Sequence, residues 1–544
     1  MGTVHSSAML RTLAAFALVL PAAAFAHDRH DRAPVAETTE GLLRGVHERG
    51  VDKFLGIPYA AAPVGNLRWR PTQPHARWHG VRDASEFANH CPQVAGPFGL
   101  ASTSEDCLYL NVFTPAREDH HGDWDDHDDG RLLPVMVWIH GGALIVGESD
   151  DYDPADLVDR EVVVVTINYR LGVFGFLAHP ALTAESPDHV SGNYGLMDQQ
   201  AALRWVQRNI SRFGGDPRRV TIFGESAGGL SVHSHLTSPL SAGLFQHAIV
   251  ESGAYALTFP PMAALETLGT AIAGAAGCTD QTATCLRAAP VATLLDARNA
   301  VGPTSVVPDI DGKVLTQSPG TAFASGQFNQ VPVIEGSNHD EWRLFVGLTA
   351  VSTTPPTLVT PATYLAFIQA TLGVNAPTAA FLATRYPLAN YPNPDLALSA
   401  MGTDAVFACN SRKAVRLLSQ WVPVHAYEFN DENAPQLFLP PFQEADGSFF
   451  PYGSAHASEI QYLFGLRSAI PHPALTRDQQ RLSKAMVSYW TNFAKLGNPN
   501  WFFTPLWRKY DATADNIQSL VPPTPSTETG FAADHQCAFW APTP

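Results

Sequence analysis

Short, continuous apolar runs recur along the chain and alternate with segments of helical periodicity. Because the runs show little apolar–polar alternation, they predict strands buried on both faces, as in a mostly parallel sheet with helices on either side. Helical spacing of apolar residues is clearest in 198–209 and 227–236. The pattern therefore predicts an α/β fold. The apolar runs are 133–139, 162–167, 220–223, 248–250, 331–334 and 424–429.

Two further segments, 260–308 and 353–421, are helical in pattern, and the first is rich in alanine. They predict helical insertions that shape a cleft near the carboxyl ends of the strands, where sheets of this kind gather their chemistry. No Pro/Ser-rich linker and no repeat interrupts the 544 residues. We therefore expect residues 27–544 to form a single large domain.

The first 26 residues have the pattern of a secretory signal peptide. One cation, Arg11, precedes the apolar run 13–20, and the segment ends in Ala24-Phe25-Ala26, which fits small-x-small cleavage. The run is too short to span a bilayer, and no later stretch is long enough either. We expect a secreted or periplasmic protein without a membrane span, cleaved after Ala26. An uncleaved N-terminal helix is the alternative.

The chain is acidic, with a formal net charge of −17 that becomes more negative by one when Arg11 is removed. A polyanion would be repelled, which excludes nucleic acid as a partner. The six cysteines are an even number in an oxidising compartment, which predicts disulfides, although composition leaves all the pairings open. These cysteines are Cys91, Cys107, Cys278, Cys285, Cys409 and Cys537.

The segment 220–232 begins as an apolar strand and then turns polar and glycine-rich at Gly224-Glu225-Ser226-Ala227-Gly228. A strand that enters a helix through Gly-x-Ser-x-Gly predicts a sharp turn that pushes one hydroxyl outward. Ser226 is therefore the candidate nucleophile. Acyl transfer would further need a base beside the serine, a carboxylate to orient the base, and donors for an oxyanion.

Each of these groups has candidates in the sequence. The strand 135–139 ends in His140-Gly141-Gly142-Ala143, whose backbone amides could face a substrate oxygen, although a simple turn is the alternative. The strand 331–336 is followed by a polar loop with three ionisable candidates for the acid: His339, Asp340 and Glu341.

The base is sought among 21 histidines. In α/β hydrolases it follows the acid in the chain, and His456 precedes a predicted helix, 457–464. His425 lies inside an apolar run and is interpreted as a core residue. His472 lies between prolines, and His535 lies near the terminus.

The chain resembles the type B carboxylesterase and cholinesterase family of α/β hydrolases over nearly its whole mature length. The segment 105–112, Glu-Asp-Cys-Leu-Tyr-Leu-Asn-Val, resembles one family signature, and Phe213-Gly-Gly-Asp216 continuing to Gly228 resembles the other. The family's acid is the glutamate of an Asp-Glu pair, which falls on Glu341. Its histidine lies in Gly-x-x-His before Glu-Ile, which falls on His456.

The resemblance also implies roles for residues around the triad. It implies an oxyanion hole formed by the amides of Gly142, Ala143 and Ala227, in which Ala143 replaces a glycine found in most relatives. Glu225 and Ser252 fall where relatives keep polar residues behind the triad, although either could be a solvated or core residue. The implied disulfide pairs are Cys91 with Cys107, Cys278 with Cys285, and Cys409 with Cys537.

We therefore expect a serine carboxylesterase that acts on small-molecule esters through an acyl-enzyme and needs no cofactor. A hydrolase of amides or peptides on the same fold, or a non-catalytic binding protein, is the alternative. Leu144, Trp342 and Phe345 neighbour the predicted site and suggest an apolar substrate pocket, although core positions are equally typical of such residues. The identity of the ester and the oligomeric state are left open.

The segment 118–129 is rich in histidine and aspartate. It lacks cysteine and has no histidine pair at helical spacing, so it does not match a zinc motif. We interpret residues 117–130 as a solvated insertion loop and expect no metal site, with weak cation binding as the alternative.

Overall fold

The computed structural model describes residues 33–116, 131–302, 307–467 and 470–541. The predicted signal segment 1–26 and the predicted loop 117–130 lie outside the described residues.

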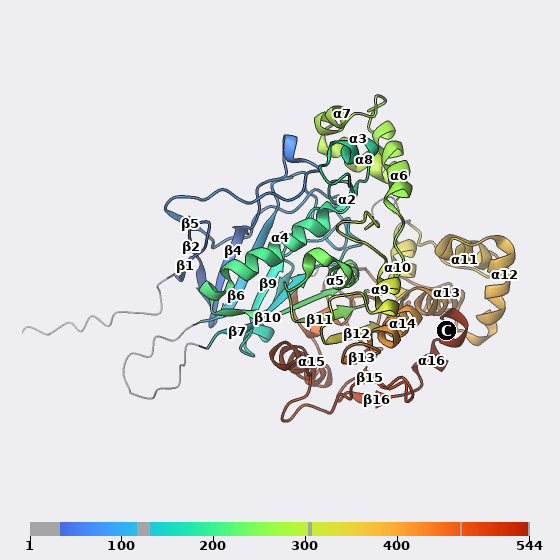
Figure 1. Cartoon of the computed structure of the whole chain (residues 1–544). Coiled ribbons are helices and arrows are strands. Elements are labelled where there is room, and N and C mark those ends of the chain that lie inside the picture. The colour runs from blue at the N-terminus through green and yellow to red at the C-terminus, as the bar shows by residue number, and fades with distance from the viewer. Residues whose placement is uncertain (1–32, 117–130, 303–306, 468–469, 542–544) are drawn as a thin grey trace, which may run out of the picture.

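A mixed sheet of 11 strands lies at the centre, in the order β16-β15-β13-β12-β11-β10-β7-β9-β6-β4-β3 (Figure 1). Neighbouring strands from β15 to β9 run parallel, while the pairs at both edges are antiparallel. The strands are β3 (Val46–Glu48), β4 (Val51–Pro58), β6 (Tyr109–Pro115), β7 (Leu133–Ile139), β9 (Val163–Ile167), β10 (Gly215–Glu225), β11 (His247–Glu251), β12 (Val333–Asn338), β13 (Val424–Phe429), β15 (Ile517–Leu520) and β16 (Ser526–Glu528).

Smaller sheets are formed by β1 (Val35–Glu37), β2 (Leu42–Arg44) and β5 (Val81–Asp83), and by β8 (Tyr152–Asp153) with β14 (Gly465–Leu466).

The strands of the central sheet supply apolar side chains to both faces because successive residues point to opposite sides. On β7, Val135 and Val137 join one core, whereas Met136 and Trp138 join another, and all four are fully buried. Helices α4 (Tyr194–Asn209), α5 (Ala227–Thr237) and α14 (Cys409–Leu418) cover the first face. Helices α1 (Ala155–Val158) and α15 (Arg477–Leu496) cover the second. The prediction of a mostly parallel sheet covered on both sides is confirmed.

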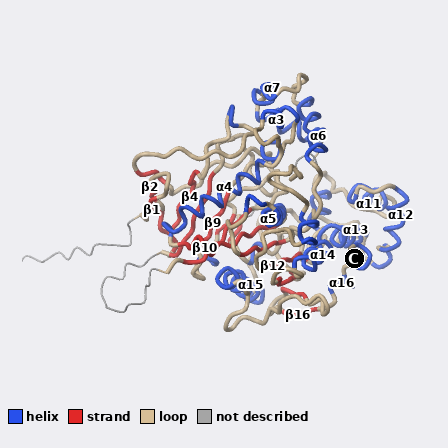
Figure 2. Tube along the Cα trace, in the orientation of Figure 1, coloured by secondary structure: helices blue, strands red, loops and turns tan. Residues whose placement is uncertain are grey.

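Two groups of helices project from this frame, as Figure 2 shows. The upper group contains α2 (Gly172–Phe176), α3 (Pro180–Glu185), α6 (Met262–Ala275), α7 (Ala283–Ala288) and α8 (Val291–Val301). The second group, which we call the second helical lobe, contains α10 (Arg343–Val351), α11 (Tyr364–Leu372), α12 (Ala376–Arg385), α13 (Pro394–Gly402) and the π-helix η7 (Thr403–Ala408). Each group has its own apolar core.

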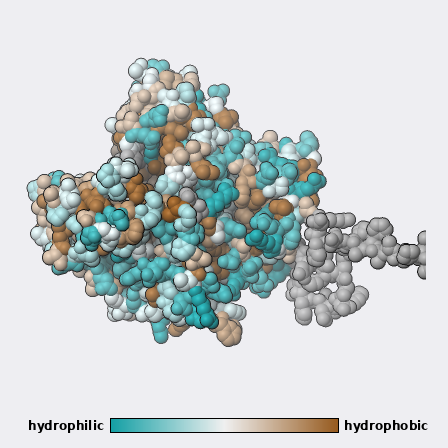
Figure 3. All heavy atoms as spheres, turned by 180° about the vertical axis from the view of Figure 1, so that it is seen from behind, coloured by the Kyte–Doolittle hydropathy of each residue, from teal (hydrophilic) through white to brown (hydrophobic). Residues whose placement is uncertain are grey.

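The remaining α-helices are α9 (Pro319–Ser325), α16 (Phe531–Asp534) and α17 (Cys537–Trp540). Apolar and polar residues are mixed over the face seen in Figure 3, and apolar residues gather between the two projecting groups.

The insertions predicted at 260–308 and 353–421 form helices in the two projecting groups, as expected.

The prediction of a helix at 457–464 is wrong. The structure has turns there, followed by a 3₁₀-helix, η8 (Ile460–Tyr462). Ala457 has a φ of 67°, which is left-handed backbone that cannot continue an α-helix. His456 consequently lies in a turn.

Among the described residues, no single helix is long and apolar enough to cross a membrane. Only the sharply bent pair Tyr364–Leu372 and Ala376–Asn390, taken together, passes by length and composition.

Three disulfides join Cys91 to Cys107, Cys278 to Cys285, and Cys409 to Cys537. These are the pairs that the family resemblance implied. The third ties the start of α14, under the sheet, to the C-terminal helix α17, across a sequence separation of 128 residues. It therefore closes the longest loop of the three.

Removing the third disulfide should cost more stability than removing the second. In the chain-entropy model, the double variant Cys409→Ser/Cys537→Ser should lose about 5 kcal/mol of unfolding free energy, and Cys278→Ser/Cys285→Ser about 2.5 kcal/mol. Urea unfolding of both variants beside the parent measures the difference. Equal losses would contradict an effect of loop length.

Candidate active site

Ser226 stands at a sharp turn between β10 and α5, with φ 56° and ψ −119°. Its N–H donates to the carbonyl oxygen of Glu251 at 2.8 Å. The flanking glycines are required by packing: a Cβ on Gly228 would lie 1.9 Å from the carbonyl oxygen of Ile139, and one on Gly224 would lie 2.5 Å from the same atom. The strand, turn and helix predicted for this segment are confirmed, and Ser226 is half-buried while its neighbours are buried.

Glu341 and His456 form a direct contact although 115 residues separate them. The imidazole Nδ1 lies 2.5 Å from Oε2 of Glu341. The other carboxylate oxygen, Oε1, accepts from the hydroxyl of Ser252 at 2.6 Å and from the N–H of Asn338 at 2.8 Å. Both oxygens of Glu341 are therefore engaged, which fixes the orientation of the carboxylate and of the ring that it holds.

The other acid candidates have different partners. Asp340 forms an ion pair with Arg343 at 2.8 Å and accepts from the N–H of Ser454 at 3.1 Å. His339 lies 3.2 Å from Asp340. Asp340 therefore braces the loop that carries His456, while Glu341 contacts the imidazole itself.

Nε2 of His456 faces the turn that carries Ser226. It lies 3.2 Å from Oε1 of Glu225, the residue directly before the serine. Nε2 accepts no hydrogen bond from the described residues, and His456 is buried. The nitrogen is therefore available to a proton donor at the turn.

A group of glutamates sets the charge around His456. Burial alone would lower the pKa of this imidazole, but the negative charges of Glu225 and Glu341 outweigh burial and raise the pKa to about 9. Burial in turn raises the pKa of Glu225 well above its usual range, and raises those of Glu459 to about 7 and Glu251 to about 8.

The segment after β7 packs against the Ser226 turn. A Cβ on Gly141 would lie 2.9 Å from the carbonyl oxygen of Glu225 and 3.2 Å from Cβ of Ser226. Gly142 and Ala143 follow with φ of 95° and 55°, and their N–H groups donate to no backbone oxygen among the described residues. Ala227 begins α5, so its N–H also has no partner within the helix. Of the three amides predicted as oxyanion donors, that of Ala227 directly follows Ser226, and those of Gly142 and Ala143 follow Gly141, which packs against the Ser226 turn; their role as donors stays a prediction.

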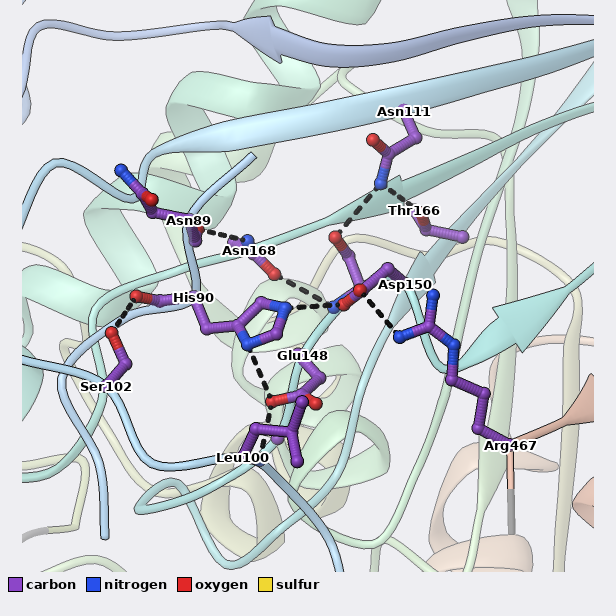
Figure 4. Close-up of polar contacts among 12 residues, drawn as sticks. Asn89, His90, Leu100, Ser102, Asn111, Glu148, Asp150, Thr166, Asn168 and Arg467 are labelled. Atoms are coloured by element: carbon purple, nitrogen blue, oxygen red, sulfur yellow. Dashed lines mark hydrogen bonds and ion pairs between the residues drawn. The ribbon is translucent and has the colours of Figure 1, made fainter. Parts of the chain in front are cut away.

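Behind this segment, a polar cluster holds residues 148–150 in place (Figure 4). The amide of Asn111 donates to the hydroxyls of Ser149 and Thr166, each at 3.0 Å. The side chain of Asn168 accepts from the N–H of Ser149 at 2.8 Å. These bonds tie the loop that follows the candidate oxyanion segment to strands β6 and β9.

The ring of His90 lies between two carboxylates of the same loop (Figure 4). Nδ1 is 3.3 Å from Glu148, and Nε2 is 2.9 Å from Asp150, which also pairs with Arg467 at 3.1 Å. The hydrogen bond with Asp150 raises the pKa of His90. A protonated imidazole would face a carboxylate oxygen from each of its two nitrogens.

Two clusters have the composition of a metal site. The first is His90, Glu148 and Asp150, and the second is His339, Glu428 and His535. In the second, against the effect of burial, Glu428 and Asp404 raise the pKa of His535 to about 10. Because each cluster places an imidazole between carboxylates, a proton on the ring accounts for the contacts in both. The absence of a required metal stays a prediction.

Aromatic rings line the approach to His456. The ring centroid of Phe345 lies 5.3 Å from that of His456, and that of Phe407 lies 4.8 Å from it. Trp342 stacks on Phe345 at 4.5 Å. Leu144, the third predicted pocket residue, is 1% exposed and packs in the main core, so Trp342 and Phe345 remain the pocket candidates.

The other histidines have structural surroundings. His425 is buried on β13 against the ring of Trp507, and burial lowers its pKa to about 4, as expected of a core residue. His472 is exposed. His140, in the oxyanion segment, stacks on Tyr169 at 4.5 Å, and burial lowers its pKa to about 4, so it is neutral.

Sequence reasoning missed three residues at the site: Asn338, Phe407 and Glu459. Asn338 contacts two glutamates: its N–H donates to Glu341, and its Nδ2 donates to Glu459 at 2.5 Å. Its position at the end of a strand, before the acid, was a usable signal. No sequence signal pointed to Phe407, because it comes from a helical insertion whose packing no local pattern determines.

The chain is similar to proteins of one family over nearly its whole length. Residues 32–540 match the model of the carboxylesterase family. A pyrethroid hydrolase of Rattus norvegicus, Ces2e, is 36% identical over 90% of this chain and 87% of the relative. The cocaine esterase of Homo sapiens is 34% identical over 93% of this chain and 91% of the relative. The fumonisin B1 esterase of Sphingopyxis macrogoltabida is 34% identical over 93% of this chain and 89% of the relative.

Solved structures show the same likeness. A PNB esterase has a TM-score of 0.76 and 31% identity over 93% of this chain and 99% of the other. A thermophilic PNB esterase has a TM-score of 0.75 and 31% identity over 93% of this chain and 100% of the other. The fold is therefore that of the α/β hydrolases, and the chain belongs to the carboxylesterase family of carboxylic-ester hydrolases.

Proposed function

We propose that the protein is a serine carboxylesterase with Ser226 as nucleophile, His456 as base and Glu341 as the carboxylate that orients the base. One observation carries the proposal: the imidazole held by Glu341 at 2.5 Å turns its other nitrogen toward Glu225, the residue before Ser226. The half-buried Ser226 at a strained turn, and the amides of Gly142 and Ala143, which donate to no backbone oxygen of the described residues, support it.

In the first step, Ser226 Oγ attacks the ester carbonyl carbon while Nε2 of His456 takes the hydroxyl proton. The carbonyl oxygen becomes an oxyanion that accepts from the amides of Gly142, Ala143 and Ala227. Collapse breaks the bond to the alkoxy oxygen, which leaves with the proton from His456. Water then attacks the acyl-enzyme with the same base, and the acid product and free Ser226 result.

The substrate class follows from the groups that face His456. Phe345, Phe407 and Trp342 offer an apolar aromatic wall, which suits esters with apolar acyl or alcohol parts. The relatives named for pyrethroid, cocaine and fumonisin B1 support a capacity for bulky esters. The methyl group of Ala143 narrows the oxyanion segment and should disfavour the bulkiest acyl groups.

Export from the cytoplasm completes the proposal. The disulfides support an oxidising compartment, and the segment 1–26 has the features of a cleaved signal. N-terminal sequencing of the mature protein is expected to begin at His27.

Ser226→Ala should lower kcat for p-nitrophenyl butyrate by about 10⁴-fold or more, because the residues of such a relay act as a unit. Steady-state kinetics on the purified mature protein measures the loss, with circular dichroism to verify folding. As a control, Ser337→Ala removes a buried hydroxyl at the end of β12 and should leave kcat within a few fold. A folded Ser226→Ala variant that kept most of its activity would remove Ser226 from the mechanism.

The pH dependence of kcat/KM should report His456. The base acts only when neutral, so activity should rise as pH rises through its pKa, which lies above that of an ordinary histidine. Glu225→Gln removes a negative charge 3.2 Å from Nε2 and should shift this acid limb down by about one pH unit. Glu432→Gln, at an exposed position, is the control and should shift nothing. An unshifted limb in Glu225→Gln would mean that Glu225 is already protonated there.

A further inference from the structure

A loop that follows α15, residues 498–507, exposes four large apolar side chains. Phe503 is fully exposed, Phe502 is 75% exposed, Leu506 is 59% exposed and Trp501 is 57% exposed. Single apolar side chains on a surface are ordinary. Four of them within six residues form an apolar patch at one loop, and patches of this kind mark contacts with another protein or with a membrane.

Hydrogen bonds within the loop hold it in this shape. The side chain of Asn500 accepts from the N–H of Trp507 at 2.7 Å and donates to the carbonyl oxygen of the same residue at 2.8 Å. The hydroxyl of Thr504 accepts from the N–H of Trp501 at 3.0 Å and donates to its carbonyl oxygen at 2.7 Å. Phe503 has a φ of 68°, which bulky residues rarely adopt. Polar side chains therefore build the loop, and the rings at its tip are left to face outward.

Both ends of the loop lie at the amino ends of parallel strands. A Cβ on Gly497 would lie 3.4 Å from the ring of Pro332, which directly precedes β12. The N–H of Tyr510 donates at 2.8 Å to the carbonyl oxygen of Val424, the first residue of β13. The candidate nucleophile and acid follow the carboxyl ends of β10 and β12, which belong to the same parallel set. The loop and the candidate active site therefore lie at opposite edges of the sheet.

Positive charges flank the exposed rings. The stretch from Lys495 to Lys509 contains three cations, the third being Arg508, and no acidic residue, in a chain whose formal net charge is −17. Arg508 and Lys509 are exposed and form no ion pair with other described residues. Lys495 lies 3.9 Å from the exposed Glu161. Asp511 accepts from backbone N–H groups of its own turn. The loop is thus an apolar tip with a cationic base.

The size of the patch argues against a second copy of the chain as its partner. At 150–250 Å² for a whole aromatic side chain, the exposed fractions correspond to roughly 500 to 600 Å² of apolar surface. A standard protein interface needs about 800 Å² on each partner. Binding to a bilayer has no such minimum, because it grows with the apolar area inserted and with the attraction of cations to anionic lipids. Tryptophan is also enriched at the level of the lipid headgroups.

We propose that this loop docks the protein onto the surface of a phospholipid bilayer. Trp501, Phe502 and Phe503 insert among the headgroups, and Arg508 and Lys509 pair with anionic phosphates. The contact is peripheral, and no single helix of the described residues is long enough to cross the bilayer. Because the candidate active site lies at the other edge of the sheet, it faces away from the bilayer and stays open to dissolved esters.

Flotation with vesicles of phosphatidylcholine and phosphatidylglycerol tests the docking on the purified mature protein. The parent should float with the vesicles. Phe502→Ser/Phe503→Ser should lower the partition coefficient about 100-fold, since burying one phenylalanine contributes about tenfold or more. The matched control Phe381→Ser/Phe449→Ser changes two exposed phenylalanines outside the loop and should bind as the parent does. A parent that stays with the soluble fraction, or equal losses in both variants, would overturn the proposal.

The lipid charge tests the cationic base of the loop. Arg508→Gln/Lys509→Gln should weaken binding to the mixed vesicles about tenfold or more, and should leave binding to pure phosphatidylcholine unchanged. An unchanged affinity of this variant for the mixed vesicles would remove Arg508 and Lys509 from the contact.

Two further measurements separate this contact from other roles of the loop. Hydrolysis of dissolved p-nitrophenyl butyrate without vesicles should be the same in Phe502→Ser/Phe503→Ser and the parent, which also verifies folding. If the parent hydrolyses no ester, the proposed function fails, and flotation still decides the docking. Sedimentation velocity should give the same mass for both proteins. A dimer that dissociates in Phe502→Ser/Phe503→Ser, without vesicle binding by the parent, would assign the loop to self-association instead.

Discussion

The close approach of three backbone segments around Ser226 is the constraint on which the site depends. The end of β7, the turn after β10 and the start of α5 meet so tightly that Gly228 has no room for a Cβ beside the carbonyl oxygen of Ile139. This contact holds the serine at a positive φ and packs Gly141, the residue before the proposed oxyanion donors Gly142 and Ala143, against the same turn. The strain is held by a parallel sheet whose two faces are both buried.

Electrostatics adds a second constraint. His456 is buried with several acidic groups, and each carboxyl that keeps its charge makes the imidazole more basic. Glu341 is oriented by Ser252 and Asn338, so its charge is held at Nδ1. Glu225, Glu251 and Glu459 have raised pKa values because burial disfavours their charge. The balance between these groups, rather than any single contact, sets the pH range in which the base is neutral.

Much of the fold and of the candidate site could be predicted from the sequence, because the informative signals are local. The strands β7 and β13 were predicted to the residue, since a short run rich in β-branched, aromatic and other apolar residues is typical of a strand buried on both faces. The turn at Ser226 followed from its glycines. His456 was found only through chain order and family resemblance. The turn after it was missed, because the left-handed backbone at Ala457 has no signature in an alanine.

Features that depend on packing between distant segments were not predictable. Phe407 reaches His456 from a π-helix in the second helical lobe, and Leu144 turns into the core rather than a pocket. The edge strands β3 and β16 are short and mostly exposed, so they leave no apolar run.

Covalent trapping tests the central claim most directly. After incubation of the mature protein with a fluorophosphonate, peptide mass spectrometry should find one stoichiometric adduct, on Ser226, and the adduct should form far more slowly in His456→Ala. Labelling of a different residue, or equally fast labelling of Ser226 without His456, would contradict the account.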